Sequence, residues 1–190
     1  MTTTGSGARN LEIKVECREV GLSDVRQRLA RRGVELSSRL RQVDTYFRVP
    51  HGRLKLREIL DYDHPAGARA ELIGYVRPDE AASRWSTYHV TAIGVGEVAS
   101  LLASLEATLG KLVRVAKRRD VAILDTTRIH LDEVEGLGAF IELETVIEGQ
   151  SEAEATAEHR RIVAELGLDR WAPISGSYSD LLLRRNRAGA

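Results

Sequence analysis

Hydrophobic and polar residues alternate with a period of two through most of this chain. The segment Leu11-Glu12-Ile13-Lys14-Val15-Glu16 places apolar side chains on one face and charged side chains on the other. Such alternation predicts half-buried strands, and His51-Gly52 reads as the turn of a hairpin. We expect strands over residues 10–17, 41–49, 53–60, 69–77, 84–92, 112–119, 120–125, 127–134 and 139–147.

Helical spacing of apolar residues interrupts the strands. We expect helices over residues 23–32, 97–109 and 151–166, and a short helical turn over 179–184. Ser23 is expected to cap the first helix and Gly33 to stop it, whereas Ser151 and Glu154 form a capping box for the third. Strands outnumber helices and come in neighbouring runs, which predicts an antiparallel α+β fold. Eight or so strands favour a β-barrel or a strongly curved sheet.

Composition limits the function classes. The chain has 190 residues with 28 basic and 28 acidic side chains, so a protein coated in basic charge for duplex nucleic acid is not expected. No apolar run is long enough for a membrane span, and residues 1–8 lack a signal-peptide core, so a cytoplasmic location without membrane partners is expected. Cys17 is the only cysteine, which excludes an internal disulfide and favours a buried, inert thiol. We expect one domain over residues 9–185, a disordered lead-in over 1–8 and a frayed tail over 186–190.

Two segments at opposite ends of the chain carry rows of carboxylates. Glu12 shares a strand face with Lys14, and Glu142 shares one with Glu144. If these strands meet, their carboxylates form a site for a hard cation such as Mg²⁺. For any single strand, an ordinary solvent-exposed polar face explains the same alternation.

Basic residues form similar rows on other predicted strands. Arg53, Lys55 and Arg57 share one face and would repel each other unless an anion lay among them. Further charged residues with matching placement are Arg77, Arg84, Lys117, Arg119, Arg128, His130 and Asp132. If all these faces point into one barrel, its polar interior suits a polyanion held by basic groups and by a divalent cation, Mg²⁺ or Mn²⁺. The apolar faces would then point outward, under the helices.

These blocks, in this order, resemble the CYTH superfamily of triphosphate tunnel metalloenzymes over about residues 9–185. Its amino-terminal hallmark is E-x-E-x-K, and the matching stretch here is Asn10-Leu11-Glu12-Ile13-Lys14, with Asn10 in place of the first Glu. The other matching blocks are Arg53-Leu54-Lys55-Leu56-Arg57, Tyr75-Val76-Arg77-Pro78-Asp79, Lys117-Arg118-Arg119, Arg128-Ile129-His130-Leu131-Asp132-Glu133-Val134 and Gly138-Ala139-Phe140-Ile141-Glu142-Leu143-Glu144. The stretch Val43-Asp44-Thr45-Tyr46-Phe47 is most similar to the class IV adenylyl cyclase-like branch.

The resemblance implies an eight-stranded antiparallel β-barrel that forms a tunnel with a polar interior, clad by helices. It implies that the metal ligands are Glu12, Asp132, Glu142 and Glu144. It implies that the triphosphate is bound by Lys14, Arg53, Lys55, Arg57, Arg77, Lys117, Arg119 and Arg128, and the pattern of charged strand residues adds Arg84 to this set. Asn10 removes one carboxylate from the row, which weakens a second metal site without forbidding it, because Asn still offers a carbonyl oxygen.

The resemblance implies a metal-dependent enzyme acting on a triphosphate such as ATP, tripolyphosphate or thiamine triphosphate. An adenylyl cyclase would form cyclic AMP and pyrophosphate, whereas a triphosphatase would release orthophosphate, and Glu12 or Glu144 could accept the proton in either. The third reading is a non-catalytic module that binds polyphosphate or nucleotide, for which Asn10 is the best support. His130 fits a proton shuttle or a structural hydrogen bond equally. The sequence pattern does not reveal the oligomeric state, and the resemblance favours a homodimer.

Overall fold

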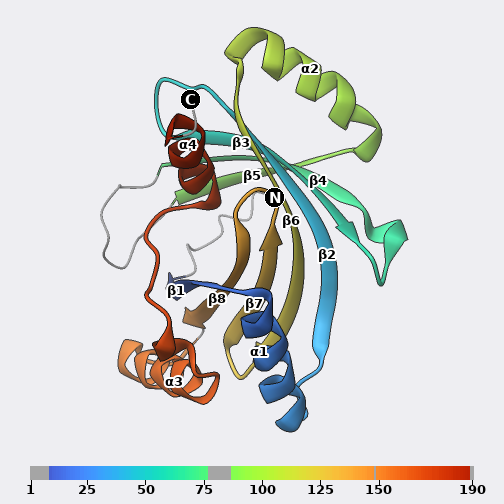
Figure 1. Ribbon diagram of the computed structural model, residues 1–190. Coiled ribbons are helices and arrows are strands. Elements are labelled where there is room, and N and C mark those ends of the chain that lie inside the picture. The colour runs from blue at the N-terminus through green and yellow to red at the C-terminus, as the bar shows by residue number, and fades with distance from the viewer. Residues whose placement is uncertain (1–8, 77–86, 148, 189–190) are drawn as a thin grey trace. The chain divides into compact units, whose positions relative to one another are not determined.

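The computed structural model describes residues 9–76, 87–147 and 149–188, so the predicted lead-in over 1–8 lies outside the described residues. It contains an eight-stranded antiparallel sheet with four helices (Figure 1). The strands are β1 (Arg9–Cys17), β2 (Leu36–Phe47), β3 (Arg53–Asp61), β4 (Arg69–Val76), β5 (Thr87–Ile93), β6 (Lys111–Leu124), β7 (Thr127–Val134) and β8 (Gly138–Ile147). The helices are α1 (Glu19–Arg31), α2 (Val98–Leu109), α3 (Glu152–Glu165) and α4 (Tyr178–Ala188). This confirms the expected α+β class.

The strands follow the order β1-β8-β7-β6-β2-β3-β4-β5. Among the described residues this order ends at β1 and β5, so the sheet is not closed and the expected closed barrel is not shown. The edge of β1 that faces away from β8 pairs with a short segment after α3. Pro173 forms a β-bridge with Val15, and the Ile174 amide donates to the Lys14 carbonyl at 2.8 Å. A short covering segment of this kind protects an edge strand without adding a strand to the sheet.

Most element boundaries agree with the alternation, but β2 begins at Leu36 and not at residue 41, and three further expectations are corrected. The expected strands over 112–119 and 120–125 are one strand, β6. Its sequence contains no Gly or Pro that could form a turn between Arg119 and Asp120. Helix α1 begins at Glu19, so Ser23 lies inside it and is not its cap; Arg18 holds that position without a side-chain bond. Helix α4 continues through Ala188, so residues 186–188 of the predicted tail are helical, and 189–190 lie outside the described residues.

Tertiary contacts group the chain into two compact units. The first contains residues up to Ser37, Asp120–Asp132 and Gly138–Ser175. The second contains Ser38–Arg119, Glu133–Leu137 and the residues from Gly176 onward.

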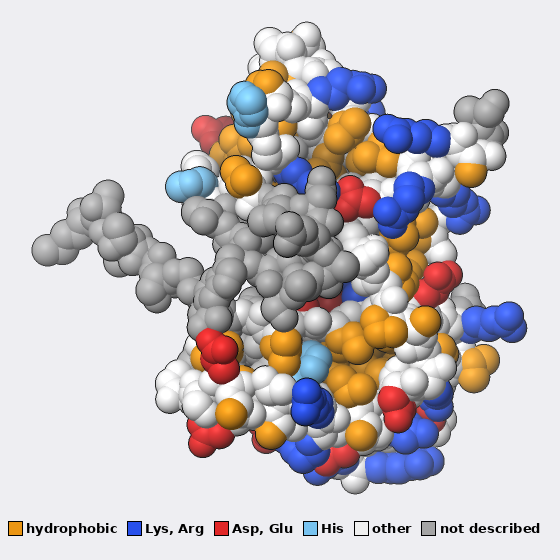
Figure 2. Space-filling model, turned by 90° about the vertical axis from the view of Figure 1, so that its left-hand side faces the viewer, with side chains coloured by type: hydrophobic (Ala, Val, Ile, Leu, Met, Phe, Trp, Pro, Cys, Tyr) orange, Lys and Arg blue, Asp and Glu red, His pale blue; other side chains and the backbone are white. Residues whose placement is uncertain are grey.

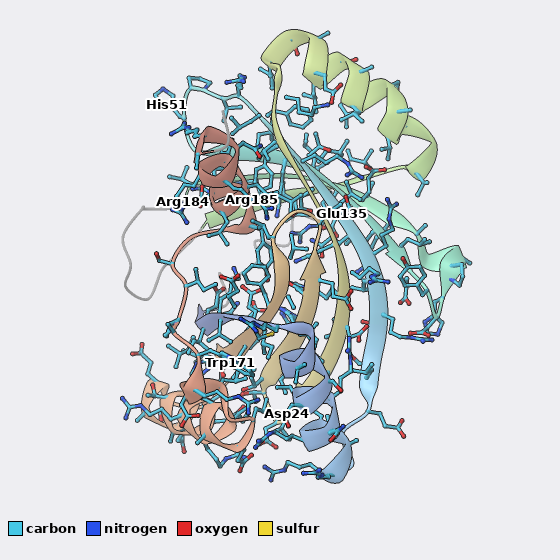
Figure 3. The ribbon with its side chains drawn as sticks, viewed as in Figure 1. Asp24, His51, Glu135, Trp171, Arg184 and Arg185 are labelled. Atoms are coloured by element: carbon cyan, nitrogen blue, oxygen red, sulfur yellow. The ribbon has the colours of Figure 1, made fainter. Side chains whose placement is uncertain are left out.

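In the first unit, the apolar faces of β1, β7 and β8 pack under α1 and α3 (Figure 1). The core formed there contains Val15, Cys17, Leu22, Val25, Leu29, Ala122, Ile129, Leu131, Ala139, Ile141, Leu143, Ile162, Leu166 and Leu168. Burial raises the pKa of the Cys17 thiol to about 11, which agrees with the expected inert role. The segment after α3 also contacts α1: Arg170 stacks on Trp171 and forms an ion pair with Asp24, and Figure 3 shows Trp171 and Asp24.

In the second unit, helix α2 covers the apolar face of the strands beside it (Figure 1). Phe47, Leu56 and Ala70 are buried there against Val98 of the helix. Because paired residues share a face, the opposite face of β3 carries Arg53, Lys55 and Arg57. Helix α4 belongs to the same unit, and Arg185, labelled in Figure 3, donates a hydrogen bond to the Gly136 carbonyl.

The expected capping box of α3 is confirmed. Ser151 accepts a bond from the Glu154 amide at 3.2 Å, and the Glu154 carboxylate accepts one from the Ser151 amide at 2.8 Å. We expect Ser151→Ala to lower the free energy of unfolding by about 1 kcal/mol, because helix amides lose their acceptor. Urea unfolding measures this difference. Ser104→Ala, at an exposed position in the middle of helix α2, is the matched control, and an equal loss there would contradict a capping effect.

Among the described residues, no helix is both long and apolar enough to cross a membrane. On the face of the molecule shown in Figure 2, basic and acidic side chains are interspersed with hydrophobic ones.

Candidate functional site

The two carboxylate-bearing strands from opposite ends of the chain pair directly, which fulfils the condition for a shared cation site. In the antiparallel register of β1 with β8, Glu12 lies opposite Glu144 and Lys14 lies opposite Glu142. Their apolar neighbours point to the other face, into the core under α1 and α3. We call Glu12, Glu142 and Glu144 the carboxylate row. Two carboxylates placed directly opposite each other repel, so the row favours a cation between them.

Glu144 is contacted from two sides. The Asn10 amide Nδ2 donates to its Oε1, and Arg128 Nη1 lies 3.5 Å from its Oε2. Asn10 therefore supplies a donor at the position where the family hallmark has a carboxylate. The substitution removes one negative charge and leaves Glu144 with a neutral partner.

Glu142 is held by basic partners on the neighbouring strands. Lys14 Nζ lies 3.1 Å from its Oε1, and His130 Nδ1 lies 3.6 Å from its Oε2. The side chains of Lys14, Glu142 and His130 are all at most 16% exposed. This part of the row is therefore a largely desolvated cluster of charged and polar groups, in which electrostatic interactions are stronger than in water.

The residues of the first unit suit a hard divalent cation bound through few protein ligands. Asn10 Oδ1 is buried and has no hydrogen-bond partner among the described atoms, which leaves an oxygen available as a ligand. Asp132 is fully buried on β7. Within the described ranges, however, no three acidic, His or Cys side chains converge into a ready metal cage. Carboxylate and amide oxygens are the ligands that hard divalent cations prefer.

The second unit contains a basic row, Arg53, Lys55 and Arg57 of β3, and a carboxylate that the sequence analysis did not assign to the site. Asp44 of β2 lies opposite Arg57 in the hairpin register. Its Oδ1 and Oδ2 accept bonds from Arg57 Nε at 2.7 Å and Nη2 at 2.8 Å, and Oδ2 also accepts one from Lys55 Nζ at 2.7 Å. Gln42 Nε2 adds a bond to Oδ1 at 3.3 Å. The anion expected among these basic residues is thus partly supplied by the chain.

Burial shapes the protonation of this cluster. For Asp44, burial alone would raise the pKa, but the bonds from Arg57 and the charges of Lys55 and Arg57 outweigh it and hold the pKa far below its usual range. For Lys55, burial lowers the pKa to about 8 against the opposing charge of Asp44, and the nearby cations Arg57 and Arg119 lower it further. Lys55 therefore lacks sufficient negative charge around it, and an added anion would favour its charged form.

Arg53 is held by a second carboxylate, from helix α4. Its Nη1 donates to Ser177 Oγ at 2.9 Å, and its Nη1 and Nη2 each lie 3.1 Å from an oxygen of Asp180. Next to Ser177, the Tyr178 ring lies 5.0 Å from Lys117 Nζ. The amino-terminal turn of α4 therefore contacts two of the predicted phosphate-binding residues.

Two further predicted phosphate-binding residues lie on β6. Lys117 is buried there, and Arg119 is half-buried on the same strand. Arg77 and Arg84 lie outside the described residues. The signal that could have found Asp44 is the hairpin register set by the turn at His51-Gly52, which brings it opposite Arg57. No local pattern indicates Asp180, which lies 127 residues from Arg53.

Comparison with known proteins gives a family. Residues 8–178 match the CYTH domain. The PH1819 protein of Pyrococcus horikoshii is 25% identical with a TM-score of 0.70, covering 93% of this chain and 99% of that one. A candidate adenylate cyclase from Vibrio parahaemolyticus is 18% identical with a TM-score of 0.61, covering 93% and 99%. A candidate adenylyl cyclase from Hippeastrum, described as having a dominant triphosphatase activity, is 14% identical with a TM-score of 0.65, covering 94% and 95%.

No protein of curated function matched the sequence of this chain. CYTH domain proteins are enzymes that act on triphosphates, and they depend in general on a metal ion. The match extends over most of the chain and includes both the carboxylate row and the basic row. This protein therefore belongs to the CYTH domain family.

Proposed function

We propose that this chain is a metal-dependent enzyme that cleaves a phosphoanhydride bond of a triphosphate, with water as the nucleophile. One observation carries the proposal: Lys55 and Arg57 share a single buried carboxylate and keep an excess of positive charge in a desolvated place. A polyphosphate chain supplies that missing negative charge and accepts hydrogen bonds from both groups. Membership of the CYTH family supports the same substrate class.

The two rows take different roles. Lys55, Arg57 and Lys117 bind phosphate oxygens and meet the charge that moves onto the leaving group. Glu12 and Glu144 would hold the cation, and Glu12 or Glu144 would accept the proton that water loses as its oxygen attacks the terminal phosphorus. The bond from that phosphorus to the bridging oxygen breaks, which gives orthophosphate and the shortened phosphate chain. When bound, Mg²⁺ or Mn²⁺ would supply further neutralisation of phosphate charge.

A second candidate differs only in the nucleophile. In an adenylyl cyclase the ribose 3′-hydroxyl of ATP attacks the α-phosphorus and releases pyrophosphate. The block around Asp44 and the candidate cyclase of Vibrio parahaemolyticus favour this reaction. The triphosphatase activity of the Hippeastrum protein favours hydrolysis. We place hydrolysis first because it requires only the phosphate chain that the basic row is suited to bind, whereas cyclisation also requires a nucleoside held with its ribose 3′-hydroxyl at the α-phosphorus.

The products decide between these candidates. The purified chain is incubated with tripolyphosphate, ATP and thiamine triphosphate, each with Mg²⁺ or Mn²⁺ and each with EDTA as the metal-free control. We expect orthophosphate from tripolyphosphate in the presence of the metal and none with EDTA, measured by ion chromatography. Cyclic AMP with pyrophosphate would establish the cyclase instead. Tight binding without any product would identify a non-catalytic binding module and overturn both enzymatic candidates.

A further inference from the structure

Asp44 is a buried carboxylate of the second unit, and both of its oxygens accept hydrogen bonds. It is 6% exposed, and its two oxygens accept bonds from Arg57, Lys55 and Gln42. Its contacts with Arg57 are parallel, Nε to one oxygen and Nη2 to the other, which fixes the plane of the guanidinium group. Nothing in the proposed reaction requires a carboxylate at this place, because its charge opposes that of the substrate.

The geometry nevertheless gives Asp44 a use. Arg57 gives Asp44 its Nε–H and one Nη2–H, so Nη1 is left for another acceptor. Lys55 gives one of its ammonium protons to Asp44, and its charge lies 5.5 Å from the Tyr46 ring and 5.9 Å from the Tyr75 ring. Both cations are therefore held in one orientation before a ligand arrives. A bound phosphate would then bind to groups that are already ordered, which reduces the loss of side-chain entropy on binding.

We propose that Asp44 is a positioning residue: it orients Arg57 and Lys55 so that their remaining N–H groups bind the phosphate chain of the substrate. This inference rests on the proposed function, because it assumes that a triphosphate binds the basic row. It makes a prediction opposite to that of simple charge counting. Removing a negative charge beside an anion site should strengthen anion binding if Asp44 only competes with the ligand. Removing a positioning group should weaken it.

The experiment measures the affinity of metal-free protein for inorganic tripolyphosphate, by titration calorimetry in EDTA. We expect Asp44→Asn to raise the Kd about tenfold or more, because the two cations lose their common acceptor. We expect Arg57→Met to raise the Kd as well. In the Arg57→Met background, Asp44→Asn should raise the Kd by less than about a further twofold, because Asp44 acts largely through Arg57. A purely structural role for Asp44 would give the same added loss in both backgrounds.

The outcomes separate the two proposals. If the wild-type chain binds tripolyphosphate neither in EDTA nor with Mg²⁺, the proposed function fails and this inference fails with it; if it binds only with Mg²⁺, the same variants are compared with Mg²⁺ present. If the wild type binds and Asp44→Asn binds equally or more tightly, only the positioning role is overturned. Should Asp44→Asn not fold, as thermal unfolding would reveal, Gln42→Leu replaces it, since it removes the 3.3 Å bond and leaves the charge of Asp44 in place. Positioning then predicts affinity about two- to fivefold weaker, and unchanged affinity overturns it.

Discussion

Replacing Glu144 by Gln should reduce metal-dependent turnover by about 100-fold or more, while the protein keeps its fold. The substitution removes the negative charge that lies opposite Glu12 on the neighbouring strand, and with it one ligand of the proposed cation site. The variant should also bind Mn²⁺ more weakly, which calorimetry or electron paramagnetic resonance measures without any reaction. Stability should change little, because the loss of the repulsion between Glu12 and Glu144 is offset by the loss of the ion pair between Glu144 and Arg128.

The matched control is Glu16→Gln. Glu16 lies on the same strand face as Glu12 and is exposed like Glu12, but it lies opposite Phe140 and not opposite a carboxylate. Its substitution should leave turnover and Mn²⁺ affinity unchanged. If Glu144→Gln retained full activity and full Mn²⁺ affinity, the carboxylate row would be a structural feature of β1 and β8 and would not bind the metal.

Replacing Lys55 by Met should stabilise the protein and at the same time weaken its binding of triphosphate. Burial holds the pKa of Lys55 at about 8, below its ordinary value of 10.5, so carrying the charge in the folded state is unfavourable at pH 7. Met has a similar volume and can pack against the rings of Tyr46 and Tyr75, whereas Asp44 keeps its bonds to Arg57. We expect a gain in the free energy of unfolding on the order of 2 kcal/mol at pH 7. Tripolyphosphate affinity should fall about 10- to 100-fold.

The pH dependence gives a second measurement of the same effect. Between pH 8 and about 10.5 the unfolded chain keeps the Lys55 proton and the folded chain has lost it, so the stability contributed by this group rises with pH. Denaturant unfolding at pH 7 and pH 9.5 should show this rise in the wild type relative to Lys55→Met. Lys111→Met, at an exposed position in the same unit, should change stability by less than about 0.5 kcal/mol. A loss of stability in Lys55→Met at pH 7 would contradict the prediction.

The elements of this fold were largely predictable from the sequence because each strand buries one face. The alternation in Leu11–Glu16 and in Ile141–Glu144 identifies both strands and the apolar face that packs into the core. The predicted start of α1 was wrong. Ser23 is a good capping residue, but tertiary packing extends the helix to Glu19. In this added turn, Gly21 lies so close to Trp171 that a Cβ atom would approach the ring to 2.9 Å. Closure of the sheet depends on which edges meet, and strand alternation contains no information on that.

The site was predictable in part, for a related reason. The alternation of strand residues identifies both rows, because residues two positions apart, such as Glu12 and Lys14 or Lys55 and Arg57, point to the same face. It does not find a carboxylate on another element that neutralises them. Asp44 lies in the mostly buried end of β2, where the sequence resembles a core segment, and its partner is determined by strand pairing. Contacts between distant segments, such as that of Asp180 with Arg53, need the tertiary structure.

In each unit, one face of the strands packs under helices and the opposite face carries the charged groups. Alternate positions of the same strands therefore serve different purposes. Along β1, the charged residues Glu12, Lys14 and Glu16 alternate with Ile13, Val15 and Cys17, which pack in the core. A substitution such as Asn for Glu at position 10 changes the ligand set without disturbing the packing beneath it. Such an arrangement makes the scaffold evolvable, because substrate and reaction can diverge by exchange of polar residues while the selection that maintains folding acts on different residues.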